Sequence, residues 1–148
     1  MKFKFAFEKV LKHRKTLEEV AQTDYLEALA DLNHELEKLN QLQVTLEDSR
    51  KYSFETQNNG GQAGSALSQV FDFQRGQDVR IERQRKVIGE HEIKVEKLQE
   101  ILRLKAIDYK IIDKLKDKKK EEFRVRENKK DQKQIDDLNV MRFKKDIT

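Results

Sequence analysis

A seven-residue repeat of apolar side chains constrains this chain more than any other feature. In the second half of the sequence, Ile81, Ile88, Val95, Leu102 and Tyr109 are spaced by sevens. Such a repeat places one apolar stripe along a helix, and the stripe predicts a seam against a partner helix. The chain contains no proline, the residue that most strongly interrupts a helix, so very long helices are possible.

An apolar stripe also runs through the first fifty residues, in steps that mostly alternate between three and four. Three consecutive steps of four, from Leu17 to Leu29, predict a stutter that locally unwinds a left-handed supercoil. We interpret this stripe as packing core. Its members are Phe7, Val10, Arg14, Leu17, Ala21, Tyr25, Leu29, Leu32, Leu36, Leu39, Leu42 or Gln43, and Leu46.

The seam of the second helix has a complementary position and a flank. Phe123 resumes the phase of the repeat after Lys116. The complementary seam position holds Gln84, His91, Leu98, Lys105 and Ile112. A flanking stripe of Ile101, Leu104, Ile111 and Leu115 widens the apolar face. This extra width predicts a further surface that a partner covers.

A glycine-rich break separates the two helical patterns. Residues 56–65 read Thr-Gln-Asn-Asn-Gly-Gly-Gln-Ala-Gly-Ser, and Gly and Asn tolerate the positive φ that a reversal needs. Ser65 is a candidate N-cap for the helix that follows. The glycines do not form a phosphate-binding loop, because no Gly-Lys-Ser/Thr follows them and no apolar strand precedes them.

One break between two heptad segments predicts an all-α fold, a long antiparallel two-helix coiled-coil hairpin with unequal arms. We expect a single domain over residues 1–148, with helix 1 at about 4–55, the tip at about 56–65 and helix 2 at about 66–144. The stretch after about residue 118 is predicted to overhang without a partner helix.

No pattern in the sequence predicts a catalytic, cofactor or metal site, and we expect no enzyme. His13, His34 and His91 are dispersed, and no His-Glu-x-x-His occurs. The chain has no cysteine, so disulfides and thiolate metal sites are excluded. No apolar run approaches the roughly 20 residues of a membrane span, so direct membrane insertion is not expected.

Charge is unevenly distributed along the chain. Residues 1–15 and residues 114–133 each carry a net charge of +5, whereas residues 16–50 carry −7. The basic stretch near the C-terminus could bind nucleic acid, but acidic residues interrupt it and no aromatic cluster offers base stacking. We favour a solvated helix with internal ion pairs and expect no nucleic-acid partner, although a basic-helix nucleic-acid binder stays open as an alternative.

Both ends of the chain carry a family resemblance. The opening, Phe3-Lys-Phe-Ala-Phe-Glu-Lys-Val-Leu-Lys-His-Arg-Lys-Thr-Leu-Glu-Glu, and the closing Lys-Lys-Asp-Gln-Lys-Gln-Ile-Asp-Asp-Leu-Asn-Val-Met-Arg-Phe resemble the two ends of FliJ proteins. These proteins are the small coiled-coil component of the flagellar type III export apparatus. The length, the glycine-rich tip and the unequal arms agree with this resemblance, which covers essentially the whole chain.

The resemblance implies a stalk similar in fold to the central γ subunit of rotary ATPases. Such a protein binds and activates the hexameric export ATPase, connects it to the membrane-embedded export gate and is associated with export chaperones. The implied location is cytoplasmic, at the inner face of the cell membrane. A general coiled-coil adaptor or structural protein is the alternative that the residues themselves leave open.

Two groups of candidate binding residues follow. The resemblance implies an aromatic surface near the tip that meets the export gate; Tyr52 and Phe73 match it, and Phe71 is a candidate by position. Gln77 falls where an apolar member of that surface is expected. At the terminal end, the apolar anchors expected to dock in the ATPase are Phe3, Phe5, Phe7, Leu138 and Met141.

Overall fold

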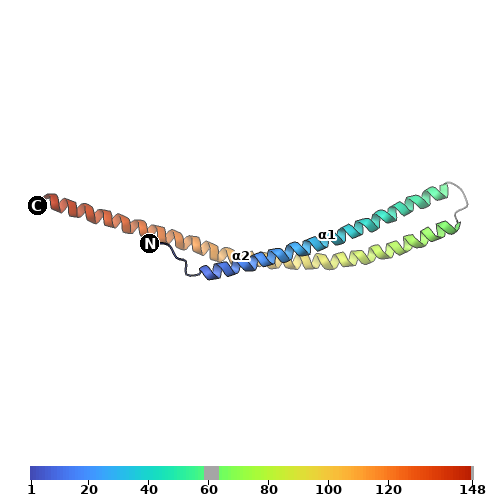
Figure 1. The fold of residues 1–148 in the computed structure, drawn as a ribbon, viewed down its shortest axis with the longest axis horizontal. Coiled ribbons are helices and arrows are strands. Elements are labelled where there is room, and N and C mark those ends of the chain that lie inside the picture. The colour runs from blue at the N-terminus through green and yellow to red at the C-terminus, as the bar shows by residue number, and fades with distance from the viewer. Residues whose placement is uncertain (59–63, 148) are drawn as a thin grey trace. The chain divides into compact units, whose positions relative to one another are not determined.

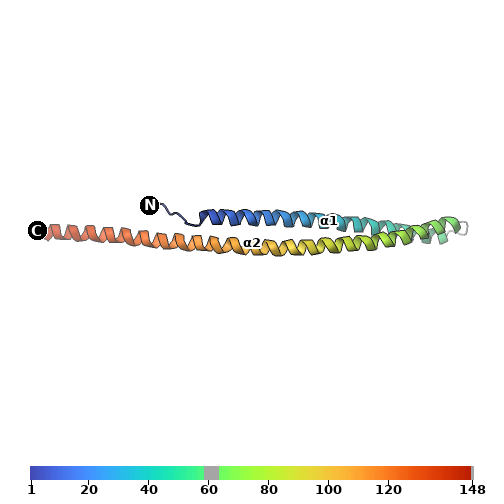
Figure 2. The ribbon, with the colours of Figure 1, turned by 90° about the horizontal axis from the view of Figure 1, so that it is seen from below.

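The computed structural model describes residues 1–58 and 64–147 of the chain. Helix α1 spans Glu8–Asn58 and helix α2 spans Gly64–Ile147, and no strand occurs among the described residues. The two helices run antiparallel and pack against each other (Figures 1 and 2). The predicted all-α helical hairpin is therefore confirmed, with arms of 51 and 84 residues.

The helix ends differ from the predicted ends in informative ways. The predicted tip falls partly on residues 59–63, which lie outside the described residues, and α1 continues to Asn58. Helix α2 begins at Gly64, so Ser65 lies inside the first turn and the prediction that it is the N-cap is wrong. At the other end, Lys144 and Lys145 occupy the last turn of α2, where cations interact favourably with the helix dipole.

The chain divides into two compact units, each containing a part of both helices. The terminal unit comprises Met1–Glu19 and Arg103–Thr148, and the tip unit comprises Val20–Leu102. In the terminal unit, the Lys116 ammonium forms an ion pair with Glu8 at 2.9 Å. In the tip unit, Gln84 donates to the backbone oxygen of Glu35 at 2.8 Å. Both contacts join residues that an antiparallel hairpin brings together.

The predicted seam of α2 is confirmed. From Leu67 to Lys116, every residue at the two seam positions is buried or half-buried, in alternating steps of three and four; beyond Lys116, Lys119 is exposed and Phe123 is half-buried. The tip unit contributes Leu67, Val70, Gln74, Gln77, Ile81, Gln84, Ile88, His91, Val95, Leu98 and Leu102, and the terminal unit contributes Lys105, Tyr109, Ile112, Lys116 and Phe123. Large apolar residues spaced by seven determine which face of α2 meets α1, because burying them contributes most to the free energy of folding.

The predicted seam of α1 is partly wrong. Four residues that we expected in the seam are exposed: Phe7, Val10, Leu17 and Leu36. Glu18 and Glu35, which adjoin the two leucines, are half-buried instead. One set of buried and half-buried residues keeps the alternation of three and four through this region, so the predicted stutter between Leu17 and Leu29 does not occur; Leu29 is half-buried beside the buried Ala28. The members of this set are Leu11, Arg14, Glu18, Ala21, Tyr25, Ala28, Leu32, Glu35, Leu39, Leu42, Leu46, Ser49, Ser53 and Thr56.

Candidate protein-binding surfaces

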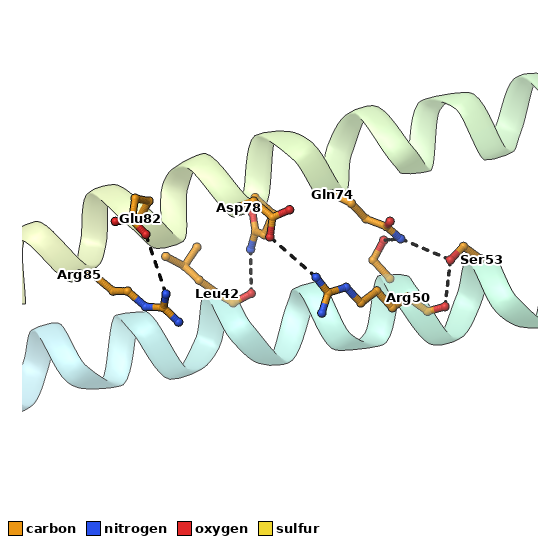
Figure 3. A network of polar contacts seen from close by, with 9 residues as sticks. Leu42, Arg50, Ser53, Gln74, Asp78, Glu82 and Arg85 are labelled. Carbon is orange, nitrogen blue, oxygen red and sulfur yellow. Dashed lines mark hydrogen bonds and ion pairs between the residues drawn. The ribbon is translucent and has the colours of Figure 1, made fainter.

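Polar side chains occupy the hairpin seam of the tip unit. The Gln74 amide donates to the hydroxyls of Ser49 and Ser53, each at 3.3 Å (Figure 3). The Gln77 amide donates to the backbone oxygen of Leu42 at 3.0 Å. Gln77, which falls where an apolar member of the tip surface was expected, is only 3% exposed, so this position belongs to the seam rather than to the surface. It lies inside the hairpin, where a polar seam residue fixes the register of the two helices.

A second polar contact crosses the seam further from the tip. The Gln84 amide donates to a carboxylate oxygen of Glu35 at 2.6 Å, and Lys38 pairs with the same carboxylate from one turn away at 3.2 Å. The hydrogen bond from Gln84, followed by the charge of Lys38, holds the pKa of Glu35 below its ordinary value of 4.5. The carboxylate is therefore stabilised in its ionised form at neutral pH.

The three predicted tip aromatics are exposed, but they lie on two different sides of the hairpin. Tyr52 and Phe73 immediately precede Ser53 and Gln74, which contact each other across the seam. In an antiparallel pair, residues that precede facing seam residues project to the same side, so these two rings share one side. Phe71 and Phe73 are 41% and 40% exposed, so neither enters the seam.

Phe71 belongs to a groove on the opposite side. The groove has a volume of about 610 Å³ and is lined by Phe71, Leu67, Arg50 and Asp78 among others. Arg50 and Asp78 immediately follow seam residues and form an ion pair at 3.9 Å, which marks this side of the hairpin (Figure 3). Phe54 is a fourth exposed aromatic of this region, and sequence reasoning missed it because it fits no seam position.

The structure separates the five predicted terminal anchors into two groups. Phe3 packs against Phe123 with ring centroids 5.7 Å apart, and Phe5 meets Phe7 edge-on at 5.8 Å. Helix α1 begins at Glu8, which pairs with Lys116, so α2 has no partner helix after about residue 118, as predicted. The prediction missed only that the non-helical N-terminal segment covers Phe123. Leu138 and Met141 lie on α2 and are 57% and 67% exposed, and all residues from 128 to 147 are exposed.

The basic part of α2 is interrupted by ion pairs. Arg124 forms two hydrogen bonds with Glu121, and this interaction lowers the pKa of the carboxyl and raises that of the guanidinium. Lys119 pairs with Glu122 at 3.5 Å. These contacts support a solvated helix with internal ion pairs more than a surface for nucleic-acid phosphates.

The described residues offer neither a membrane span nor a metal cluster. Neither α1 nor α2, as far as the structure describes them, contains a segment long and apolar enough to cross a bilayer. In the same part of the chain, no group of three or more His, Cys, Asp or Glu side chains is arranged to hold a metal ion.

Comparison with protein families gives the decisive observation. The model of the flagellar FliJ protein family matches residues 3–147. The chain belongs to the FliJ family. The resemblance seen at the two ends is thereby confirmed over nearly the whole chain. No curated protein and no solved structure gives a significant match.

Family membership sets the broad function of this FliJ chain. It is a component of the flagellar export apparatus, and the family consists of structural stalk proteins rather than enzymes. A two-helix coiled coil fits such a role, because its side chains form long surfaces for other proteins rather than an enclosed pocket.

Proposed function

We propose that this FliJ protein is the central stalk of the flagellar export ATPase complex. In this role it binds and activates the hexameric export ATPase through its terminal end, contacts the export gate near the tip and meets export chaperones at the cytoplasmic face of the membrane. The observation that carries the proposal is the family match across residues 3–147. Accessible apolar residues in both units support it.

The terminal unit has the properties that docking in a ring-shaped ATPase requires. It carries 22 Lys and Arg against 13 Asp and Glu, a net charge of +9, which favours approach to an acidic surface. Leu138 and Met141 are available as apolar anchors without any rearrangement. Phe3 is already packed on Phe123, so its contribution is to hold the N-terminal segment against α2.

Stimulation of the purified export ATPase tests this docking. We expect the variant Leu138→Gln/Met141→Gln to lose at least about tenfold in apparent affinity, because apolar anchors at an interface centre typically contribute 2 kcal/mol or more. Val44→Gln, at an exposed apolar position of the tip unit, is the matched control and should stimulate normally. Full stimulation by the double variant would exclude this placement.

The tip unit offers the surface for the export gate. Tyr52 and Phe73 share one side of the hairpin, so a single extended segment of the gate can contact both rings. Phe71 lies on the other side and is reached only by a partner that wraps around the tip. Exposed aromatic rings of this kind are favoured anchors at protein interfaces.

Binding of the gate's cytoplasmic domain to single Ala variants tests this surface. We expect Tyr52→Ala and Phe73→Ala each to weaken binding about thirtyfold with unchanged helix melting. Phe54→Ala removes a ring that is more exposed than either of these, from the outer side of α1, and serves as the control. A loss at Phe71→Ala as well indicates a wrapped gate, whereas unchanged binding of all three tip variants refutes the assignment.

A further inference from the structure

The terminal unit exposes an apolar stripe on one side of the hairpin that neither proposed docking surface uses. On α2, Leu104, Ile107 and Ile111 are all exposed, although their spacing places them on one face of the helix. On α1, Val10 and Leu17 immediately precede the seam residues Leu11 and Glu18 and are also exposed.

The two helices present these residues on the same side. Leu104 and Ile111 flank Asp108 on α2, and Asp108 immediately precedes the seam residue Tyr109. Residues that precede seam positions project to one side of an antiparallel pair, which is also the side of Val10 and Leu17. The Arg14 guanidinium donates to the backbone oxygen of Asp108 at 2.8 Å and so joins the two helices along this side. We call the surface formed by Val10, Leu17, Leu104, Ile107 and Ile111 the lateral face.

The charges beside the lateral face indicate the chemistry of its partner. Lys9 adjoins Val10 on α1, and Lys110 and Lys114 adjoin Ile107 and Ile111 on α2, whereas Asp108 adds one carboxylate between Leu104 and Ile111. The terminal unit as a whole is strongly positive, with 22 basic against 13 acidic residues. A partner that covers the apolar stripe must place carboxylates along its own edges to avoid like-charge contacts.

We propose that the lateral face binds an amphipathic, acidic helix of another protein. Leu104 and Ile111 are about 10 Å apart along α2, which matches two turns of a partner helix, so a segment of three to four turns covers the stripe. A helix of three to four turns buries less surface than the interfaces of stable complexes do, so the interaction is transient. The proposal goes beyond the stalk function and does not depend on the ATPase or gate contacts.

A second copy of this chain fits the lateral face less well. A symmetric dimer would bring the same basic borders of two copies together, and this repulsion costs affinity. A head-to-tail arrangement that joined the basic terminal unit of one copy to the acidic tip unit of the next would assemble rings or filaments of many copies rather than a defined dimer. An acidic helix from a different protein avoids both problems.

A designed peptide tests the proposal with the full-length chain. The probe is a fluorescent peptide of about 15 residues with Leu on one helical face and Glu elsewhere; its control carries Lys in place of Glu. We expect the Glu peptide to bind the wild type at least about tenfold more tightly than the Lys peptide does, by fluorescence anisotropy. Leu104→Gln/Ile111→Gln should weaken the Glu peptide by a further tenfold or more, with unchanged helix melting.

Val44→Gln supplies the matched control, because Val44 and Leu104 are both 48% exposed but lie in different units. It should bind the Glu peptide as the wild type does. Absence of binding to the wild type, equal binding of the two peptides, or normal binding of the double variant would each overturn the proposal. Self-association of the wild type that the double variant abolishes, measured by sedimentation, would overturn it too, because a second copy would then occupy the face.

Discussion

Replacing Gln77 with Leu tests the physical reasoning about the polar seam most directly. The buried Gln77 amide donates to the Leu42 oxygen, and its own oxygen accepts from the exposed Arg80 at 3.0 Å. Losing the buried hydrogen bond to Leu42 costs about 0.5–1.5 kcal/mol, whereas losing the bond from the exposed Arg80 costs little, because water replaces it. Neither former partner is left unsatisfied, because the Leu42 oxygen keeps its helical hydrogen bond and Arg80 returns to water.

The gain from the substitution is larger than this cost. A Leu side chain in a buried seam position contributes about 1.5–3 kcal/mol through the hydrophobic effect. We therefore expect Gln77→Leu to raise the free energy of unfolding by about 1 kcal/mol, which corresponds to about 2–4 °C in Tm for a chain of this size. Thermal and urea unfolding followed by circular dichroism measure the change.

Gln77→Leu should also make the alignment of α1 against α2 less strictly defined. A buried polar residue in a coiled-coil seam penalises shifted alignments, because a shift leaves its amide unpaired. Spin labels at the exposed Glu37 and Arg83 should therefore give a broader distance distribution in Gln77→Leu. Gln69→Leu, an exposed position on the same helix, should change stability by less than about 0.5 kcal/mol. A clear destabilisation by Gln77→Leu would refute the reasoning, since the amide would then contribute more than an apolar seam.

Three further predictions concern other parts of the chain. Because the pKa of Glu35 is lowered in the folded chain, its contribution to stability is present above its ordinary value of 4.5 and is lost as pH falls through the lowered pKa; Glu35→Gln should flatten this acid dependence of the urea midpoint. Gly89→Ala should raise Tm, with a gain of about 0.5–1 kcal/mol, because a methyl group there meets no atom within 4 Å; an unchanged Tm contradicts this. Phe3→Ala should remove the ring contact with Phe123 and speed proteolysis near the N-terminus, and an unchanged cleavage rate would show that the contact does not order this segment.

The seam of α2 could be predicted from the sequence, whereas that of α1 could not. On α2, Ile81 and Ile88 repeat at intervals of seven, and the flanking stripe that begins at Ile101 does not break this phase. On α1, two neighbouring stripes overlap between Leu17 and Leu36, and the more apolar one breaks the seven-residue phase. The structure keeps the phase and buries Ala28, because continuous packing against α2 requires unbroken alternation and small residues let the helices approach closely.

The candidate surfaces, too, could be predicted only in part from the sequence. The sequence identified the tip aromatics, but sequence separation alone did not show that Tyr52 and Phe73 share a side while Phe71 lies opposite. The position of Gln77 was assigned to the tip surface by resemblance, and the seam phase of the folded hairpin buries it instead. The role of each ring in gate binding stays a prediction.

By itself, the sequence determined that the chain is two long helices joined near residue 60, and that they form a hairpin without a core large enough for an enclosed site. Absence of proline, heptad spacing and a glycine-rich break are local properties, and helix formation depends on them directly. Only the tertiary structure decided which residues of α1 meet α2, that Phe3 covers Phe123, and that Val10 and Leu104 lie on one side. These outcomes depend on the phase and register between two helices, which are set by the packing of residues far apart in the sequence.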